Sequence, residues 1–80
     1  MEEIVQNAAA IKALAAGLCM GLGALGPAVG EGYVAGKALN AIGRNPEVAD
    51  KISGLVFVLM AVCESTGIYS LVIALIILFT

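Results

Sequence analysis

Residues 13–30 read ALAAGLCMGLGALGPAVG, and residues 52–80 read ISGLVFVLMAVCESTGIYSLVIALIILFT. The first run carries no charge, and the second carries a single one, Glu64. Because a helix rises about 1.5 Å per residue, each run is long enough to cross a hydrocarbon layer of about 30 Å. The two runs predict an all-α membrane protein with two membrane-spanning helices.

The composition of the whole chain agrees with a membrane environment. Of its 80 residues, 61% are hydrophobic and 12% are charged, and the mean hydropathy is +1.05. A soluble core of this length could not hide so much apolar surface from water. The net charge of −2 comes without a basic patch, which excludes a nucleic-acid partner. The start Met1-Glu2-Glu3 is unlike a secretory signal, so the first apolar run is expected to stay in the working protein.

The polar residues gather between the two apolar runs, in the segment KALNAIGRNPEVADK at residues 37–51. Gly43 is a typical helix stop, and Pro46 cannot continue a helix. The chain is therefore expected to form one antiparallel hairpin domain. Its predicted parts are a first helix at about 4–41, a polar loop at about 42–47 and a second helix at about 48–79.

The distribution of basic residues predicts the orientation of the hairpin. Lys37, Arg44 and Lys51 lie in or beside the polar loop, whereas the N-terminal end offers only Lys12. Since basic loops stay on the cytoplasmic side, the loop is expected to be cytoplasmic and both termini to face outward.

Small residues crowd the first apolar run and cover more than one helical face. Small side chains let membrane helices approach closely, so this pattern predicts neighbours on several sides, as in a closed homo-oligomeric ring. The alternative is that the glycines reflect only their general enrichment in membrane helices. The predicted packing positions are Gly17, Gly21, Gly23, Gly26, Gly30 and Gly32.

Glu64 is the residue that most needs a functional explanation. A charge near the centre of a bilayer costs at least about 2.5 kcal/mol, so an ionisable group there indicates a functional site. At about 100° per residue, Val62, Ser65 and Tyr69 share one stripe and Glu64 lies next to it. A carboxylate, a hydroxyl, a backbone carbonyl and a phenol therefore predict an ion site, with Thr66 adding a further hydroxyl.

The oxygen-rich surroundings bear on which ion the site carries. A hard cation such as Na⁺ prefers several oxygen ligands, whereas a proton needs only one carboxylate. Glu31 on the first helix is a second candidate ligand, and two carboxylates in contact share one proton or one cation. With the predicted helix ends, Glu31 lies about ten residues from the loop and Glu64 about sixteen, a mismatch of about 9 Å. Either the loop is asymmetric or Glu31 meets the Glu64 of a neighbouring copy.

The sequence offers no residues for enzymatic chemistry. It contains no His and no phosphate-binding loop, and its two cysteines lie inside apolar stretches. No cofactor, metal or ATP site is expected, and the chain is predicted to be a non-catalytic subunit.

Taken together, the glycine-rich first helix, the loop Arg44-Asn45-Pro46-Glu47 and the segment of residues 64–72, ESTGIYSLV, resemble the c-subunit, the rotor ring proteolipid of F-type ATP synthases. The resemblance covers almost the whole chain. It implies that Glu64 is the rotor carboxylate, which an arginine of a separate stator subunit unloads. It also implies that Arg44, Asn45 and Pro46 contact the central stalk in a bacterial plasma membrane, with lipids around the ring.

The helix 2 pattern is similar to that of the Na⁺-coupled members of this family. By that resemblance the ion is held by Glu64, Ser65, the Val62 carbonyl and Glu31, with Thr66 holding a water and Tyr69 bracing Glu64. Na⁺-binding relatives often have glutamine where this chain has Glu31, so the site could also run on protons. The first helix of this family has glycine at alternate positions. This chain has alanine at two of these five positions, which could change the number of copies per ring. The alternatives outside this family are a holin-like pore and a subunit of a small drug-proton antiporter.

Overall fold

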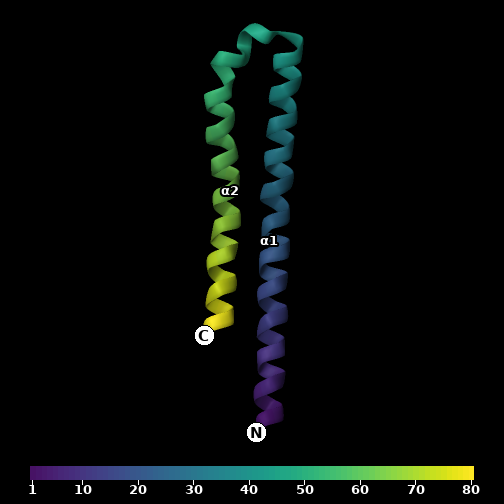
Figure 1. Cartoon of the computed structure of the whole chain (residues 1–80), viewed down its shortest axis with the longest axis vertical. Coiled ribbons are helices and arrows are strands. Elements are labelled where there is room, and N and C mark those ends of the chain that lie inside the picture. Colours follow the sequence, from purple (N-terminus) through teal and green to yellow (C-terminus); the bar gives the residue numbers. More distant parts are fainter.

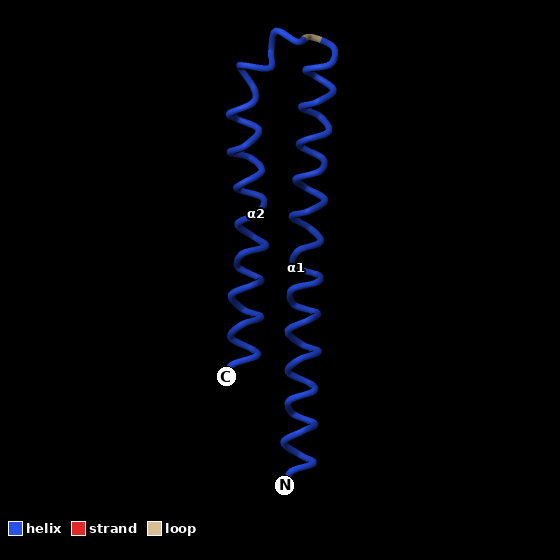
Figure 2. Tube along the Cα trace, in the orientation of Figure 1, coloured by secondary structure: helices blue, strands red, loops and turns tan.

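The computed structural model describes all 80 residues as a single helical hairpin (Figure 1). Helix α1 spans Glu2–Arg44, a short 3₁₀ helix η1 spans Pro46–Val48, and helix α2 spans Ala49–Phe79. The molecule measures 67 × 16 × 9 Å, and Figure 2 shows almost no chain outside the helices. The all-α hairpin predicted from the two apolar runs is confirmed.

Both arms are long enough and apolar enough to cross a membrane. The most apolar window of 18 residues has a mean hydropathy of 1.8 in Glu2–Arg44 and 2.1 in Pro46–Phe79. The N-terminal part of α1 continues well beyond the end of α2 (Figure 1). Since the hairpin is longer than a hydrocarbon layer of about 30 Å, its ends reach beyond that layer.

Helix α1 ends later than the sequence indicated. It runs to Arg44, three residues beyond the expected end at 41, and passes through Gly43 without a left-handed residue. The stop comes from Pro46 instead, because a proline disfavours helical backbone in the residue before it. Asn45 accordingly leaves the helix with φ −146° and ψ 87°. The expected stop at Gly43 was therefore wrong.

The turn is short and internally bonded. The Asn45 N–H donates to the Ala41 carbonyl at 2.9 Å, and the Val48 N–H donates to the Asn45 carbonyl at 3.1 Å. The Asn45 side-chain oxygen accepts the Glu47 N–H at 3.3 Å, so Asn45 caps η1 while closing α1. One residue outside helical structure thus joins two long helices.

The two helices meet along one seam. Buried and half-buried residues recur at spacings of three and four, the pattern by which antiparallel helices interdigitate. On α1 the seam contains Ala16, Met20, Gly23, Pro27, Gly30, Val34, Ala38 and Ala41, and on α2 it contains Ala49, Ser53, Val56, Met60, Cys63, Gly67, Ser70, Ala74 and Ile77. Only Ala16, Gly67 and Ala74 are fully buried, so one hairpin leaves nearly all of its apolar surface for lipid or for other copies.

The predicted packing glycines divide into two groups. Gly23 and Gly30 face α2, where an added Cβ would overlap the Ser70 side chain or lie 3.6 Å from Cys63 Sγ. At Gly17, Gly21, Gly26 and Gly32 an added Cβ would meet nothing within 4 Å. The hairpin therefore explains the small size of Gly23 and leaves the second group exposed to partners outside the chain.

Gly23→Ala is expected to destabilise the hairpin because its methyl group would displace Ser70. The matched control is Gly67→Ala in the facing helix, whose Cβ would have ordinary contacts of 3.6–3.8 Å. Circular dichroism of the purified protein in detergent during thermal denaturation measures the difference. Gly23→Ala should lower the transition temperature while Gly67→Ala leaves it near the wild-type value, and equal transitions would contradict the close contact of Gly23 with Ser70.

Candidate ion-carrying site

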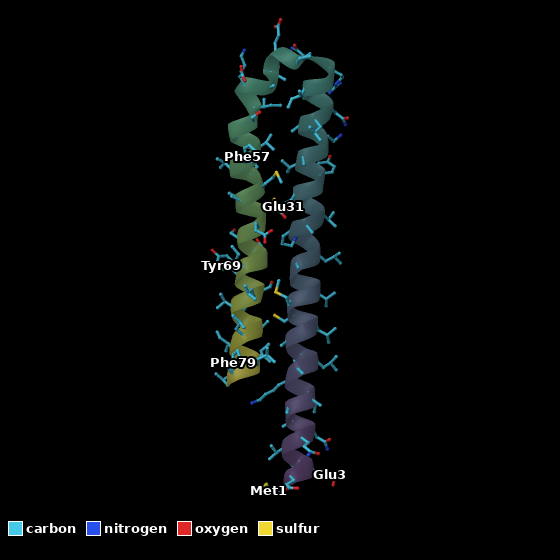
Figure 3. The ribbon with its side chains drawn as sticks, in the orientation of Figure 1. Met1, Glu3, Glu31, Phe57, Tyr69 and Phe79 are labelled. Carbon is cyan, nitrogen blue, oxygen red and sulfur yellow. The ribbon has the colours of Figure 1, made fainter.

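Two carboxylic acids meet between the helices. Glu31 of α1 is half-buried and lies between the two arms in Figure 3. Its carboxyl group faces that of Glu64 of α2 closely enough for a side-chain hydrogen bond when one of them is protonated. Glu64 remains exposed at the edge of the interface. The chain thus brings its two intramembrane acids together within a single copy.

The position of the turn explains why the two acids lie at the same height. Glu31 is thirteen residues before Arg44, the end of α1, and Glu64 is fifteen residues after Ala49, the start of α2. The expected mismatch of six residues falls to two, because α1 ends three residues later and α2 begins one residue later than the sequence indicated. With α1 extended to Arg44 and η1 leading into α2, the connection is asymmetric enough to align the two carboxyl groups.

The layer beside the acids is closely packed. Gly67 is buried, and a Cβ built on it would lie 3.6 Å from Glu64 Oε1 and 3.7 Å from Pro27 Cγ. Gly67 therefore lies next to both the proline ring and the carboxyl group, and an added methyl group would pack against them without overlap. Pro27 and Gly67 were not among the predicted site residues, although a proline inside an apolar helix is a signal that could have indicated them.

The other predicted ligands lie on a different face. The Ser65 hydroxyl donates to the Val62 carbonyl at 2.6 Å, which places these two oxygens together. Val62 is 61% exposed and Tyr69 is 67% exposed, and Figure 3 shows Tyr69 pointing away from α1. At about 100° per residue, Val62 and Tyr69 are turned by about 160° and about 140° from Glu64. One hairpin therefore holds the ligand set as two separate halves.

The remaining predicted positions are also exposed. The Thr66 carbonyl accepts a hydrogen bond from the Ser70 hydroxyl at 3.3 Å, and its side chain lies outside the seam. Arg44, Asn45 and Pro46 are exposed at the tip of the hairpin. Just below the tip, the Lys37 ammonium lies 5.5 Å from the centre of the Tyr33 ring, and Lys37, Asn40 and Arg44 line a polar hollow. The tip is thus a charged surface, well separated from the acid pair.

The geometry limits what the site can do. Two carboxyl groups in contact repel each other when both are charged, and an ion or a proton shared between them removes this repulsion. One proton leaves the pair with one negative charge, which a monovalent cation then balances. The pair can therefore hold a small cation in a form whose total charge is zero.

The fold and the acid pair define a class of small membrane protein, a two-helix hairpin with a carboxyl pair at its seam. The comparisons with known proteins specify the class further. The family model of the ATP synthase c-subunit matches residues 14–77. The chain belongs to this ATP synthase c-subunit family, and the membership supports a role in the rotor ring.

Curated relatives match over most of the chain. The ATP synthase c-subunit of Petrotoga mobilis is 52% identical over 68 residues, which are 85% of this chain and 71% of the relative. The c-subunit of Thermotoga petrophila is 51% identical over 67 residues, 84% of this chain and 79% of the relative. The c-subunit of Dehalococcoides mccartyi strain BAV1 is 51% identical over 69 residues, 86% and 91% of the two chains. The family predicted from the sequence motifs is confirmed.

Cross-linking tests whether Glu31 and Glu64 meet in one copy. In a protein with Cys19 and Cys63 replaced by alanine, Glu31→Cys with Glu64→Cys should give an intramolecular product with a short bifunctional thiol reagent, because the two side chains face each other. Glu31→Cys with Tyr69→Cys is the control, since Tyr69 points away from α1. Mass spectrometry after disassembly identifies the product. A product found only between two chains would contradict the described register.

Proposed function

We propose that this chain is an ion-carrying subunit of an ATP synthase rotor ring, in which Glu64 loads and releases a Na⁺ ion shared with Glu31. The observation that supports this most directly is the meeting of the two carboxyl groups inside the apolar part of the hairpin. The subunit itself is non-catalytic. Its chemistry is the binding of a cation, and the transported ion is cargo rather than a cofactor.

The division of the ligands between two faces supports a ring. One edge of the hairpin presents Glu31 and Glu64, and another presents the Val62 carbonyl and the Ser65 hydroxyl. If the second edge of one copy packs against the first edge of the next, all four oxygen sources surround one ion. Such a contact is head-to-tail, and head-to-tail contacts close into rings when the rotation allows. The open space at four glycines of α1 also fits close neighbours.

The roles of the ligands follow from charge and size. Glu64 provides the full negative charge. Glu31 retains a proton and binds the ion through its unprotonated oxygen, and Ser65 and Val62 provide neutral oxygen ligands. Thr66 would hold a water molecule, and Tyr69 of the neighbouring copy would brace Glu64. With one proton and one Na⁺ the site is neutral, so it can face lipid, whereas the empty charged site costs several kcal/mol there. Release therefore has to occur where water or a fixed positive charge reaches Glu64.

This requirement defines the partners of the ring. A stator subunit with an arginine facing Glu64 would displace the ion, and the tip formed by Arg44, Asn45 and Pro46 would contact the central stalk. Moving one charge across about 100 mV provides about 2.3 kcal/mol, so several ions must cross for each ATP. A ring of identical subunits adds together the free energies of these single-ion steps. The loop would be cytoplasmic and both termini outward, in a bacterial plasma membrane whose lipids surround the ring.

The second candidate is the same ring driven by protons. It is favoured by Glu31, because a two-carboxyl pair binds a proton without any further ligand. In that case the neutral oxygens of Ser65 and Val62 are not needed for the ion. The two candidates differ in what protects Glu64 from modification.

Carbodiimide labelling distinguishes the two ions, because the reagent attacks a protonated carboxyl group. The purified ring is labelled over a pH series with and without NaCl, and mass spectrometry follows modification of Glu64. Na⁺ should slow labelling, with KCl at the same ionic strength as the control. If NaCl and KCl give the same rates at every pH, the ring carries protons.

The mass of the intact detergent complex should correspond to many copies, and a monomer or dimer would exclude the ring.

Ser65→Ala tests the proposed second half of the site. Removing one neutral oxygen ligand should raise the Na⁺ concentration that halves the labelling rate by about tenfold, which is about 1.4 kcal/mol. Ser53→Ala is the matched control, since the Ser53 hydroxyl donates to the Ala49 carbonyl of its own helix at 2.5 Å, far from the acids. A Ser65→Ala ring with wild-type Na⁺ protection would remove Ser65 from the ligand set.

A further inference from the structure

Pro27 creates a local problem inside the membrane-spanning part of α1. A proline has no backbone N–H, so the carbonyl of Gly23, four residues earlier, loses its usual partner in the helix. Gly23 lies in the uncharged run of residues 13–30. Lipid offers no donor there, and an unpaired backbone group is costly in such surroundings. The Gly23 carbonyl therefore needs a donor from another part of the protein.

Ser70 of α2 lies directly against this backbone. A Cβ built on Gly23 would overlap both the hydroxyl oxygen and the Cβ of Ser70. The hydroxyl therefore lies in the direction in which Gly23 carries a hydrogen in place of a side chain. The glycine allows this approach, and any other residue at position 23 would prevent it.

The present partner of the Ser70 hydroxyl is a weak one. It donates to the Thr66 carbonyl at 3.3 Å, which is long for a hydrogen bond between two oxygens. In a regular α-helix that carbonyl already accepts the N–H of residue 70, so the hydroxyl is not required there. Rotation about the Cα–Cβ bond of Ser70 turns the hydroxyl away from that carbonyl.

We propose that the Ser70 hydroxyl supplies the hydrogen bond that Pro27 removes from the Gly23 carbonyl, and that this interhelical bond fixes the register of the two arms at the ion site. Gly23 and Ser70 form one layer of the seam, and Pro27 and Gly67 form the next. The second layer includes the contact with Glu64 Oε1. Ser70 is thus a positioning residue, which acts on Glu31 and Glu64 through the alignment of the helices.

The sequence allows a direct measurement on the Gly23 carbonyl. Gly23-Ala24 is the only glycine-alanine pair in the chain. Labelling with carbonyl-¹³C glycine and ¹⁵N alanine therefore gives one carbon–nitrogen correlation in solid-state NMR of the ring in lipid, and its carbon shift reports hydrogen bonding at Gly23. Ser70→Ala should move this signal upfield, and Ser53→Ala should leave it unchanged. A Ser70→Ala signal at the wild-type position would overturn the proposal.

Pro27→Ala completes a double-mutant cycle with Ser70→Ala, because alanine returns an N–H to the Gly23 carbonyl. In that background Ser70→Ala should no longer move the signal. An equal shift in both backgrounds would show that the change comes from packing, and would overturn the proposal. If the Ser70→Ala protein does not assemble into a ring, the double variant is the test. Assembly of the Pro27→Ala, Ser70→Ala ring would support the proposal. If Pro27→Ala assembles and the double variant does not, the proposal is contradicted.

The effect on the ion site rests on the proposed function and is measured separately. Carbodiimide labelling of Glu64 in the Ser70→Ala ring should need a Na⁺ concentration about three- to tenfold higher for half protection, as expected for loss of one interhelical hydrogen bond. In the Pro27→Ala background, Ser70→Ala should no longer raise the Na⁺ concentration needed for half protection. If Na⁺ does not protect the wild-type ring from labelling, the Na⁺ assignment fails. The readout is then the pH at which Glu64 labelling is half-maximal, in place of the Na⁺ concentration for half protection. The NMR result is independent of which ion binds.

Discussion

A carboxyl group inside lipid needs a partner, and this constraint organises the rest of the hairpin. Glu64 cannot be charged and alone near the middle of a membrane, and the protein provides Glu31 from the opposite helix. For the two groups to meet, both helices must be straight, antiparallel and held at one height. The turn at Asn45 and the extension of α1 to Arg44 both contribute to that alignment.

The seam is built for close approach rather than for a large apolar core. Membrane helices gain little from hiding apolar surface from one another, because lipid is equally apolar. Small residues, a proline ring and polar contacts therefore take part in the packing, as between Gly23 and Ser70 or between Pro27 and Gly67. The exposed flanks and the open space at Gly17, Gly21, Gly26 and Gly32 leave the hairpin incomplete by itself. This incompleteness fits a family whose members work as rings.

The separation of the candidate ligands also has a functional meaning in the proposed ring. If each ion lies between two copies, loading and unloading are sensitive to how neighbouring subunits meet. The acid pair alone would bind a proton, and the oxygens of the adjacent copy would add the ligands that Na⁺ requires. The choice of ion is then a property of the contact between subunits rather than of one helix.

The sequence alone determined the class of fold and indicated the residue on which the proposed chemistry depends. Two apolar runs, a polar segment containing Pro46 and the single charge at position 64 were enough to predict the hairpin, because lipid permits few other structures for such a chain. The motifs around Glu64 were enough to indicate the family. Only the tertiary structure decided that Glu31 meets Glu64 in the same copy, because that depends on where the turn lies, and an error of three residues at the end of α1 shifts one arm by almost a full turn. Only the tertiary structure could show that Ser70 lies against Gly23, since spacing along one helix does not fix which face meets the other.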